Sequence, residues 1–186
     1  ACFSMNPMKV FGGYGDAGAV CSDSLNTINK IKSLRYAGTI NKEFVVDPDL
    51  NHKIDSLQAT ILLNQLKFLK SKIKKRISNA FFYEKNLTNK VIKPKFYSDG
   101  RHVYYTYSIM VRNREKLINK LSKKGIETKI QHPFIISDHP GLKNNLHGSL
   151  KNTRSISKRI LSIPVHEKLK RKQLQYIVDN INKFYE

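Results

Sequence analysis

The chain has 186 residues, of which 40% are hydrophobic and 26% are charged, and it contains no tryptophan. This length and composition exclude a peptide, a collagen-like chain and a wholly disordered protein, and they indicate a globular chain with a substantial core. The formal net charge of +20 comes from 34 Lys and Arg against 14 Asp and Glu. Residues 1–50 hold five basic and five acidic side chains, so the excess lies entirely in residues 51–186. This asymmetry predicts two regions of different kinds, joined near residue 50.

Cysteine usage and the start of the chain bear on where the protein works. Cys2 and Cys21 match neither a disulfide framework nor a zinc-binding spacing, which predicts a reducing compartment and a cytoplasmic protein. The sequence has no run of about 18 apolar residues and no signal-peptide pattern, so we expect no membrane partner. The chain opens with Ala1 and then Cys2-Phe3, which we expect to form an interior strand. We therefore also expect an N-terminal portion that this sequence lacks.

The N-terminal region predicts a strand and a helix joined by loops. Four glycines in VFGGYGDAGAVC (10–21) predict a tight loop, able to approach a ligand closely, that leads into a buried strand. Ser22 or Asp23 can cap the next helix, which Gly38 ends. The apolar residues of this helix recur at helical spacing: Leu25, Ile28, Ile31 and Leu34. Residues 39–53 predict a connecting loop.

The middle of the chain predicts its longest helix, followed by a strand, a helix and a strand. The long helix is indicated by an apolar stripe with lysines on the opposite face: Ile54, Leu57, Ile61, Leu62, Leu66, Leu69, Ile73, Ile77 and Phe81. His102–Arg112 is aromatic and β-branched, which predicts a strand. Asn113 can cap a helix that ends at Gly125, and Ile126–Ile130 predicts another strand.

The last third begins with a loop-like stretch and ends in a helix. Residues 132–153 contain Pro and Gly at several positions, and Ile160–Pro164 is a short apolar piece. A terminal amphipathic helix is predicted from its apolar positions: Leu174, Ile177, Val178, Ile181 and Phe184. Strands alternating with helices predict the α/β class.

The strongest candidate for chemistry is Lys9, in the segment FSMNPMK (3–9) that precedes the glycine-rich loop. A lysine among apolar neighbours can lose its proton by desolvation, and a neutral amine beside a hydroxyl suits Schiff-base chemistry. The local sequence alone leaves a solvated surface lysine as the alternative.

Several ordered blocks of the sequence resemble one known family, the PLP-dependent sugar aminotransferases of the DegT/DnrJ/StrS group. The blocks are FSMNPMK (3–9), GDAGAV (15–20), LRYAG (34–38), NHKIDSLQA (51–59), GIET (125–128) and LSIPVH (161–166). Their order along the whole chain is more specific than any single motif. The resemblance implies part of the aspartate-aminotransferase fold, fold type I. Residues 1–50 would be the last part of the large PLP-binding domain, and residues 51–186 the small domain, entered through the long helix.

The resemblance also implies roles for three residues. Lys9 resembles the lysine that holds pyridoxal 5'-phosphate (PLP) as a Schiff base and moves a proton; related sugar dehydratases have histidine there, so Lys9 favours transamination. Ser4 resembles a hydroxyl that binds the cofactor phosphate, and a capping or strand-edge serine is the alternative. Asn51 resembles the residue that reaches the phosphate of the neighbouring protomer's cofactor, which implies a homodimer. An ordinary loop or helix-cap Asn is the alternative.

The sequence departs from the family pattern at two places. Lys53 stands where the family usually has Arg, which removes a bidentate contact with an anion. Gln131-His132-Pro133 stands where His-Tyr-Pro is common, so His132 either contacts the sugar nucleotide or packs within a loop. The remaining candidate histidines have no spacing typical of a metal site, and no metal is expected: His139, His147 and His166.

The resemblance covers only the C-terminal half of such enzymes. It implies that the acid that pairs with the cofactor's pyridine nitrogen and the aromatic that stacks on its ring lie upstream of Ala1, so the chain as given is expected to be inactive alone. The implied function is transamination of a keto-sugar nucleotide, with glutamate as amino donor, in amino-sugar and surface-polysaccharide biosynthesis. The alternatives are a basic nucleic-acid-binding module and a non-catalytic truncated product. Lysines interleaved with Leu and Ile at helical spacing favour solvated helix faces over the nucleic-acid module.

Overall fold

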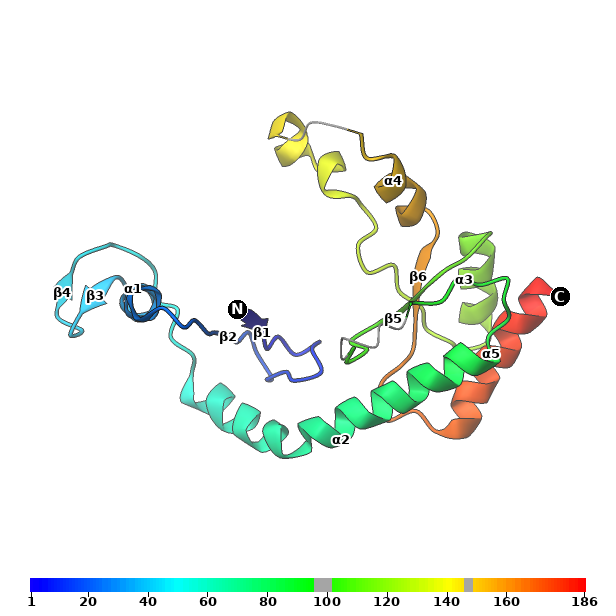
Figure 1. The fold of residues 1–186 in the computed structure, drawn as a ribbon, viewed down its shortest axis with the longest axis horizontal. Coiled ribbons are helices and arrows are strands. Elements are labelled where there is room, and N and C mark those ends of the chain that lie inside the picture. Colours follow the sequence, from blue (N-terminus) through cyan, green and yellow to red (C-terminus); the bar gives the residue numbers. More distant parts are fainter. Residues whose placement is uncertain (96–101, 146–148) are drawn as a thin grey trace. The chain divides into compact units, whose positions relative to one another are not determined.

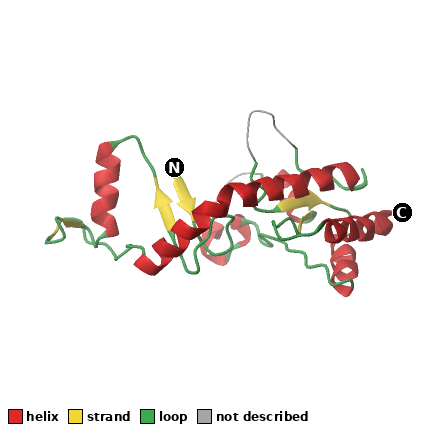
Figure 2. Cartoon of the chain, turned by 90° about the horizontal axis from the view of Figure 1, so that it is seen from below, coloured by secondary structure: helices red, strands yellow, loops and turns green. Residues whose placement is uncertain are grey.

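A computed structural model of the chain describes residues 1–95, 102–145 and 149–186 (Figure 1), so His147 lies outside the described residues. The chain divides into two compact units, Ala1–Ser71 and Lys72–Glu186. The long helix α2 (Ser56–Asn86) contributes to both units (Figure 2), and it confirms the predicted longest helix. The assignment of residues 1–50 and 51–186 to a large and a small domain stays a prediction. None of the described helices combines the length and the apolarity needed to cross a membrane.

The first unit begins with a two-stranded antiparallel ribbon. Strand β1 (Cys2–Ser4) pairs with β2 (Gly18–Val20), and Ser4 lies opposite Gly18. Both strands were expected to be buried, and that expectation is wrong for this chain, since β1 is exposed throughout and Val20 is 43% exposed. A ribbon of two strands covers neither of its own faces, and the described residues of the first unit add no third strand to it.

Helix α1 (Leu25–Arg35) forms where its apolar spacing predicts, but its cap differs from the prediction. Ser24 is the N-cap, and its Oγ accepts a hydrogen bond from the backbone N–H of Thr27 at 3.3 Å. Gly38 follows the helix as predicted, with a φ of +68° that favours glycine. A Cβ at Gly38 would lie 1.5 Å from the carbonyl oxygen of Asp47, so the position also requires the absence of a side chain.

Residues 39–53 contain a hairpin that the sequence did not indicate. Strand β3 (Thr39–Ile40) pairs with β4 (Phe44–Val45) in an antiparallel register. Residues 41–43 join the strands, and Asn41 and Lys42 have φ values of 52° and 65°. Asn adopts such a left-handed conformation readily, whereas Lys seldom does. Because Lys42 stands where a tight hairpin usually has Gly after Asn, the sequence lacks the Asn-Gly signal of such a turn.

The second unit is built around a two-stranded antiparallel sheet with helices packed against it. Strand β5 (Tyr107–Met110) pairs with β6 (Ile160–Ile163) in the register Tyr107 to Ile163. Helices α3 (Arg114–Lys123) and α5 (Arg171–Tyr185) and the second half of α2 complete its core. The core includes several residues with no exposed surface: Tyr83, Ile109, Leu117, Leu121, Leu161 and Ile181. The predicted terminal helix is therefore confirmed, and it buries Leu174, Ile177, Val178 and Ile181.

Three predictions for the second unit need correction. The strand expected over His102–Arg112 is limited to β5, and Ile126–Ile130 forms only an isolated bridge between Lys129 and Ser162. The stretch expected to be loop holds two short 3-10 helices, η1 (Ile136–Asp138) and η2 (Pro140–Asn145), and helix α4 (Lys151–Ser157). None of the residues of α4 is buried, so this helix carries no apolar periodicity from which it could be predicted.

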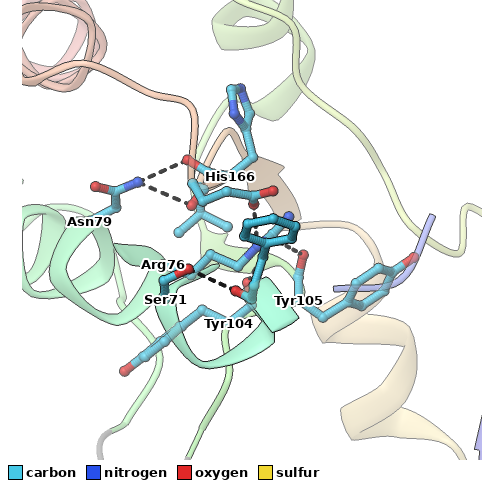
Figure 3. A network of polar contacts seen from close by, with 9 residues as sticks. Ser71, Arg76, Asn79, Tyr104, Tyr105 and His166 are labelled. Carbon is cyan, nitrogen blue, oxygen red and sulfur yellow. Dashed lines mark hydrogen bonds and ion pairs between the residues drawn. The ribbon is translucent and has the colours of Figure 1, made fainter. Parts of the chain in front are cut away.

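A polar network fastens α2 to the segment that follows β6 (Figure 3). The Arg76 guanidinium donates to Glu167 at 2.9 Å and to the carbonyl oxygens of Tyr104 and Tyr105 at 3.2 and 3.3 Å. One turn further along, the Asn79 amide donates to the carbonyl oxygen of His166 at 2.9 Å. The block LSIPVH (161–166) is thus held on α2 by its backbone, while the His166 side chain is exposed.

Candidate active site

The segment that carries Lys9 begins at the end of β1 and turns back on itself. Ser4 is the last residue of the strand, and its side chain is exposed. The Met5 N–H then donates to the carbonyl oxygen of Ala17 at 2.8 Å, and the Lys9 N–H donates to the carbonyl oxygen of Asn6 at 2.8 Å. Lys9 is half-buried. Ser4 and Lys9 therefore lie in one short, hydrogen-bonded segment, as the candidate site requires.

Asn6 organises this turn through both ends of its side-chain amide. Its Oδ1 accepts from the Met8 N–H at 3.0 Å, and its Nδ2 donates to the Asp16 carboxylate at 2.8 Å. An Asn that bonds to the backbone two residues ahead fixes a tight turn before the chain reaches Lys9. Neither Asn6 nor Asp16 was predicted as a site residue from the sequence, although Asn6-Pro7 is a turn signal.

The glycine-rich loop closes on the protein's own backbone and on α2. The Gly13 N–H donates to the carbonyl oxygen of Met5 at 2.9 Å, and the Tyr14 N–H donates to the Gln58 side chain of α2 at 2.8 Å. A Cβ on Gly12 would lie 2.6 Å from the carbonyl oxygen of Asn6. Glycine at position 12 is thus required for the loop to pack against the turn that carries Lys9. Gln58 is a further positioning residue, and the sequence pattern did not predict it.

Substitution of Gly12 by alanine is expected to displace this turn. The new Cβ meets a backbone carbonyl that cannot rotate away, so we expect destabilisation of the first unit by about 1–3 kcal/mol. Amide hydrogen exchange at Lys9, whose N–H is bonded to Asn6, should accelerate at least about tenfold. Gly141→Ala is the matched control, because a Cβ there meets no atom within 4 Å. Unchanged exchange at Lys9 in Gly12→Ala would show that the loop does not position this lysine.

Asn51 pairs with Tyr36, the residue that follows α1, and it lies outside the segment that carries Ser4 and Lys9. Its backbone forms a bridge with Tyr36, and the neighbouring His52 N–H donates to the carbonyl oxygen of Arg35 at 3.0 Å. The Asn51 side chain is exposed, and its Oδ1 accepts from the Lys53 N–H at 3.1 Å. This local bond fits the alternative of a turn-forming Asn, and it leaves the Nδ2 donor of Asn51 available for an anion.

Two lysines flank the Tyr36 ring beside Asn51. Lys53 Nζ lies 5.4 Å and Lys42 Nζ 5.6 Å from the ring centroid, which is within the range of a cation–π contact. The Lys53 ammonium is therefore held over an aromatic face, close to Asn51. It supplies positive charge there without the planar fork of a guanidinium.

His132 belongs to the second unit, and its side chain is exposed. It follows the bridge between Lys129 and Ser162, and the adjacent Gln131 amide donates to the Tyr105 hydroxyl at 3.3 Å. The segment that leads into His132 is thus anchored, while the imidazole is open to solvent. Its contact with a sugar nucleotide stays a prediction.

Comparison with known proteins identifies the family. Residues 1–182 match the DegT/DnrJ/EryC1/StrS aminotransferase family. The chain belongs to this family. The resemblance seen in the sequence is therefore confirmed, and the match does not favour a nucleic-acid-binding module.

Two curated relatives align over the whole chain. The pleiotropic regulatory protein of Geobacillus stearothermophilus is 29% identical over 194 residues, which cover 100% of this chain and 51% of the relative. The dTDP-3-amino-3,4,6-trideoxy-alpha-D-glucose transaminase of Streptomyces venezuelae is 26% identical over 190 residues, which cover 100% of this chain and 50% of the relative. The chain thus spans about half the length of these relatives.

The solved structures agree with the family match. The crystal structure of a DegT DnrJ EryC1 StrS aminotransferase from Brucella abortus superposes with a TM-score of 0.93 at 27% identity, covering 98% of this chain and 50% of that one. The predicted fold class is therefore confirmed: the chain forms part of the α/β fold of the PLP-dependent aminotransferases, fold type I.

Proposed function

We propose that this chain supplies the lysine-bearing half of a PLP-dependent aminotransferase that acts on a keto-sugar nucleotide. The observation that carries the proposal is the half-buried Lys9 in a turn fixed by Asn6 and closed by the glycine loop, within a chain of the aminotransferase family. A relative from Streptomyces venezuelae and one from Campylobacter jejuni are named as transaminases of dTDP- and UDP-linked amino sugars. These names support amino-sugar biosynthesis as the setting.

The donor set of the Lys9 segment fits PLP. The cofactor carries an aldehyde and a phosphate, so it needs a primary amine and hydrogen-bond donors to an anion. Lys9 supplies the amine, and the exposed Ser4 hydroxyl, five residues earlier in the same segment, supplies a donor. PLP, when bound, withdraws electrons from the substrate carbon. Lys9 would hold the cofactor and carry the proton between that carbon and the cofactor, a role that requires its amine to be free of charge for part of the cycle.

Asn51 would complete a phosphate site across a homodimer interface. Its place beside Tyr36 at the end of α1, outside the Ser4–Lys9 segment, is compatible with a role toward a second protomer. The Nδ2 of Asn51 would donate to the phosphate of the partner's cofactor, and the lysines on Tyr36 would add positive charge. His132 would contact the sugar nucleotide, and an amino acid such as glutamate would donate the amino group. We expect the enzyme to work in the cytoplasm.

Borohydride reduction of the native protein, followed by peptide mass spectrometry, tests the proposal. Reduction converts a Schiff base into a stable pyridoxyl-lysine, so we expect one adduct, located on the peptide that contains Lys9. The other lysines of the chain serve as internal controls, because they would react only through non-specific attachment. Absence of an adduct at saturating PLP, or adducts spread over several lysines, would contradict the proposed role. The intact mass, compared with 21.5 kDa, reports separately whether the native protein is longer than this chain.

A further inference from the structure

A cavity of about 380 Å³ lies in the second unit, outside the candidate active site. Four segments line it: the turn after α2, the end of β5 with the residues leading into α3, the residue before β6, and the end of α5. Its volume falls within the range of about 300–1,000 Å³ that is usual for small-molecule sites. None of the residues assigned above to cofactor or sugar nucleotide lines it.

Hydrogen bonds to backbone carbonyls join the segments that line the cavity. Ile92 and Met110 exchange two backbone bonds of 3.1 and 2.9 Å, and the Val111 N–H donates to the carbonyl oxygen of Arg159 at 3.0 Å. The Tyr185 hydroxyl donates to the carbonyl oxygen of Arg112 at 2.7 Å. The backbone around the cavity is therefore fixed by the fold, which lowers the part of the entropic cost of binding that comes from ordering the chain.

Positive charge dominates the lining. Three of its lining residues are cationic, namely Lys90, Arg112 and Arg159, and none of the described residues that line it is acidic. Within the described part of the chain, none of the three forms an ion pair. Arg159 donates to the Ser155 carbonyl and hydroxyl at 3.2 Å, and Lys90 donates to the Tyr185 carbonyl, so the partners of both are neutral. Helix α3 begins immediately after Asn113, which also lines the cavity, and its N-terminal dipole adds to the positive potential.

We propose that this cavity binds a small phosphate-bearing anion. Two arginines and a lysine among the lining residues can supply several charges and donors, which suits a phosphate better than the single charge of a carboxylate. Ile92, Met110 and Tyr185 supply an apolar side to the same cavity, which suits an organic group attached to the phosphate. The proposal concerns the second unit alone and does not depend on the role of Lys9.

Calorimetric titration of the full chain with inorganic phosphate and with phenyl phosphate tests this site. We expect saturable binding with one site per chain, and tighter binding of phenyl phosphate than of inorganic phosphate because the ring can contact the apolar side. Arg112→Gln and Arg159→Gln should each weaken binding about 5- to 10-fold, because each removes a charge-assisted contact. Lys123→Gln, which removes the same charge from an exposed position near the end of α3, should change the affinity less than about twofold. Ser4→Ala should also leave it unchanged, which separates this site from that of the cofactor phosphate.

Backbone amide shifts measured during the same titration locate the ligand. We expect the largest shifts at Ile92, Val111 and Asn113 in the unsubstituted chain, a readout that does not require any variant to fold. Equal weakening by Lys123→Gln, or shifts scattered over the basic surface, would overturn the proposal and show non-specific attraction to a chain of net charge +20. The absence of saturable binding would overturn it as well.

Discussion

Replacement of Lys9 by alanine in the native protein is expected to lower the transamination rate by roughly 10³- to 10⁴-fold. The substitution removes the amine that would hold the cofactor and move the proton, while the turn around Asn6 depends on backbone and Asn6 atoms that the variant keeps. The pyridoxyl adduct found after borohydride reduction should disappear at the same time. Steady-state rates with a nucleotide-sugar substrate and mass spectrometry of the reduced protein measure the two effects independently.

Lys70→Ala is the matched control for this experiment. Lys70 is an exposed lysine on α2, where alanine is well tolerated, so both the rate and the adduct on Lys9 should be preserved. Addition of a small primary amine should restore part of the rate of Lys9→Ala, because a free amine can replace the missing proton carrier. Retention of full activity by Lys9→Ala would remove the basis of the proposed function.

Apolar spacing predicted helices α1, α2 and α5, and α5 gives the clearest case of predicted positions that face a core. Helix α5 was predicted from Leu174, Ile177 and Ile181, and all three are buried. Helix α2 was also predicted, but its buried face in the second unit includes Asn79 and Tyr83, whereas Phe81 of the predicted stripe is 43% exposed. The predicted apolar stripe was wrong at this point because a polar residue, Asn79, faces the core. Its amide donates hydrogen bonds to the backbone carbonyls of Val165 and His166 in the segment after β6.

Short elements escaped prediction because tertiary contacts rather than local patterns stabilise them. The hairpin of β3 and β4 carries a Lys at a positive φ, and the bridge at Lys129 depends on its pairing with Ser162 across more than thirty residues of sequence. The candidate site shows the same division. Lys9 and Ser4 follow from the resemblance to a family. Asn6, Asp16 and Gln58 could not be predicted in this way, because their roles depend on hydrogen bonds that form only in the folded loop.

Arg76→Ala is expected to lower the free energy of unfolding of the second unit by about 3 kcal/mol. The Arg76 side chain is 12% and the Glu167 side chain 23% exposed, so the substitution leaves a poorly solvated carboxylate without its cation. The carbonyl oxygens of Tyr104 and Tyr105 lose their donor as well (Figure 3). Urea unfolding at neutral pH measures the loss. Lys75→Ala, at the preceding exposed position of α2, should lower the free energy of unfolding little. Arg76→Lys should have an intermediate effect, because lysine keeps the charge but lacks the planar guanidinium and its several donors.

The same pair predicts how stability depends on pH. Burial by itself would raise the pKa of Glu167, but a backbone N–H and the charge of Arg76 outweigh it, so the pKa lies below its usual value. A carboxylate with a lowered pKa in the folded state contributes stability above its unfolded pKa of about 4.3, and the contribution is lost as the pH falls through the folded pKa. The unsubstituted chain should therefore lose stability more steeply below about pH 4.3 than Arg76→Ala does. If both proteins lost stability equally steeply below this pH, Arg76 would act through its contacts with the backbone carbonyls and not through Glu167.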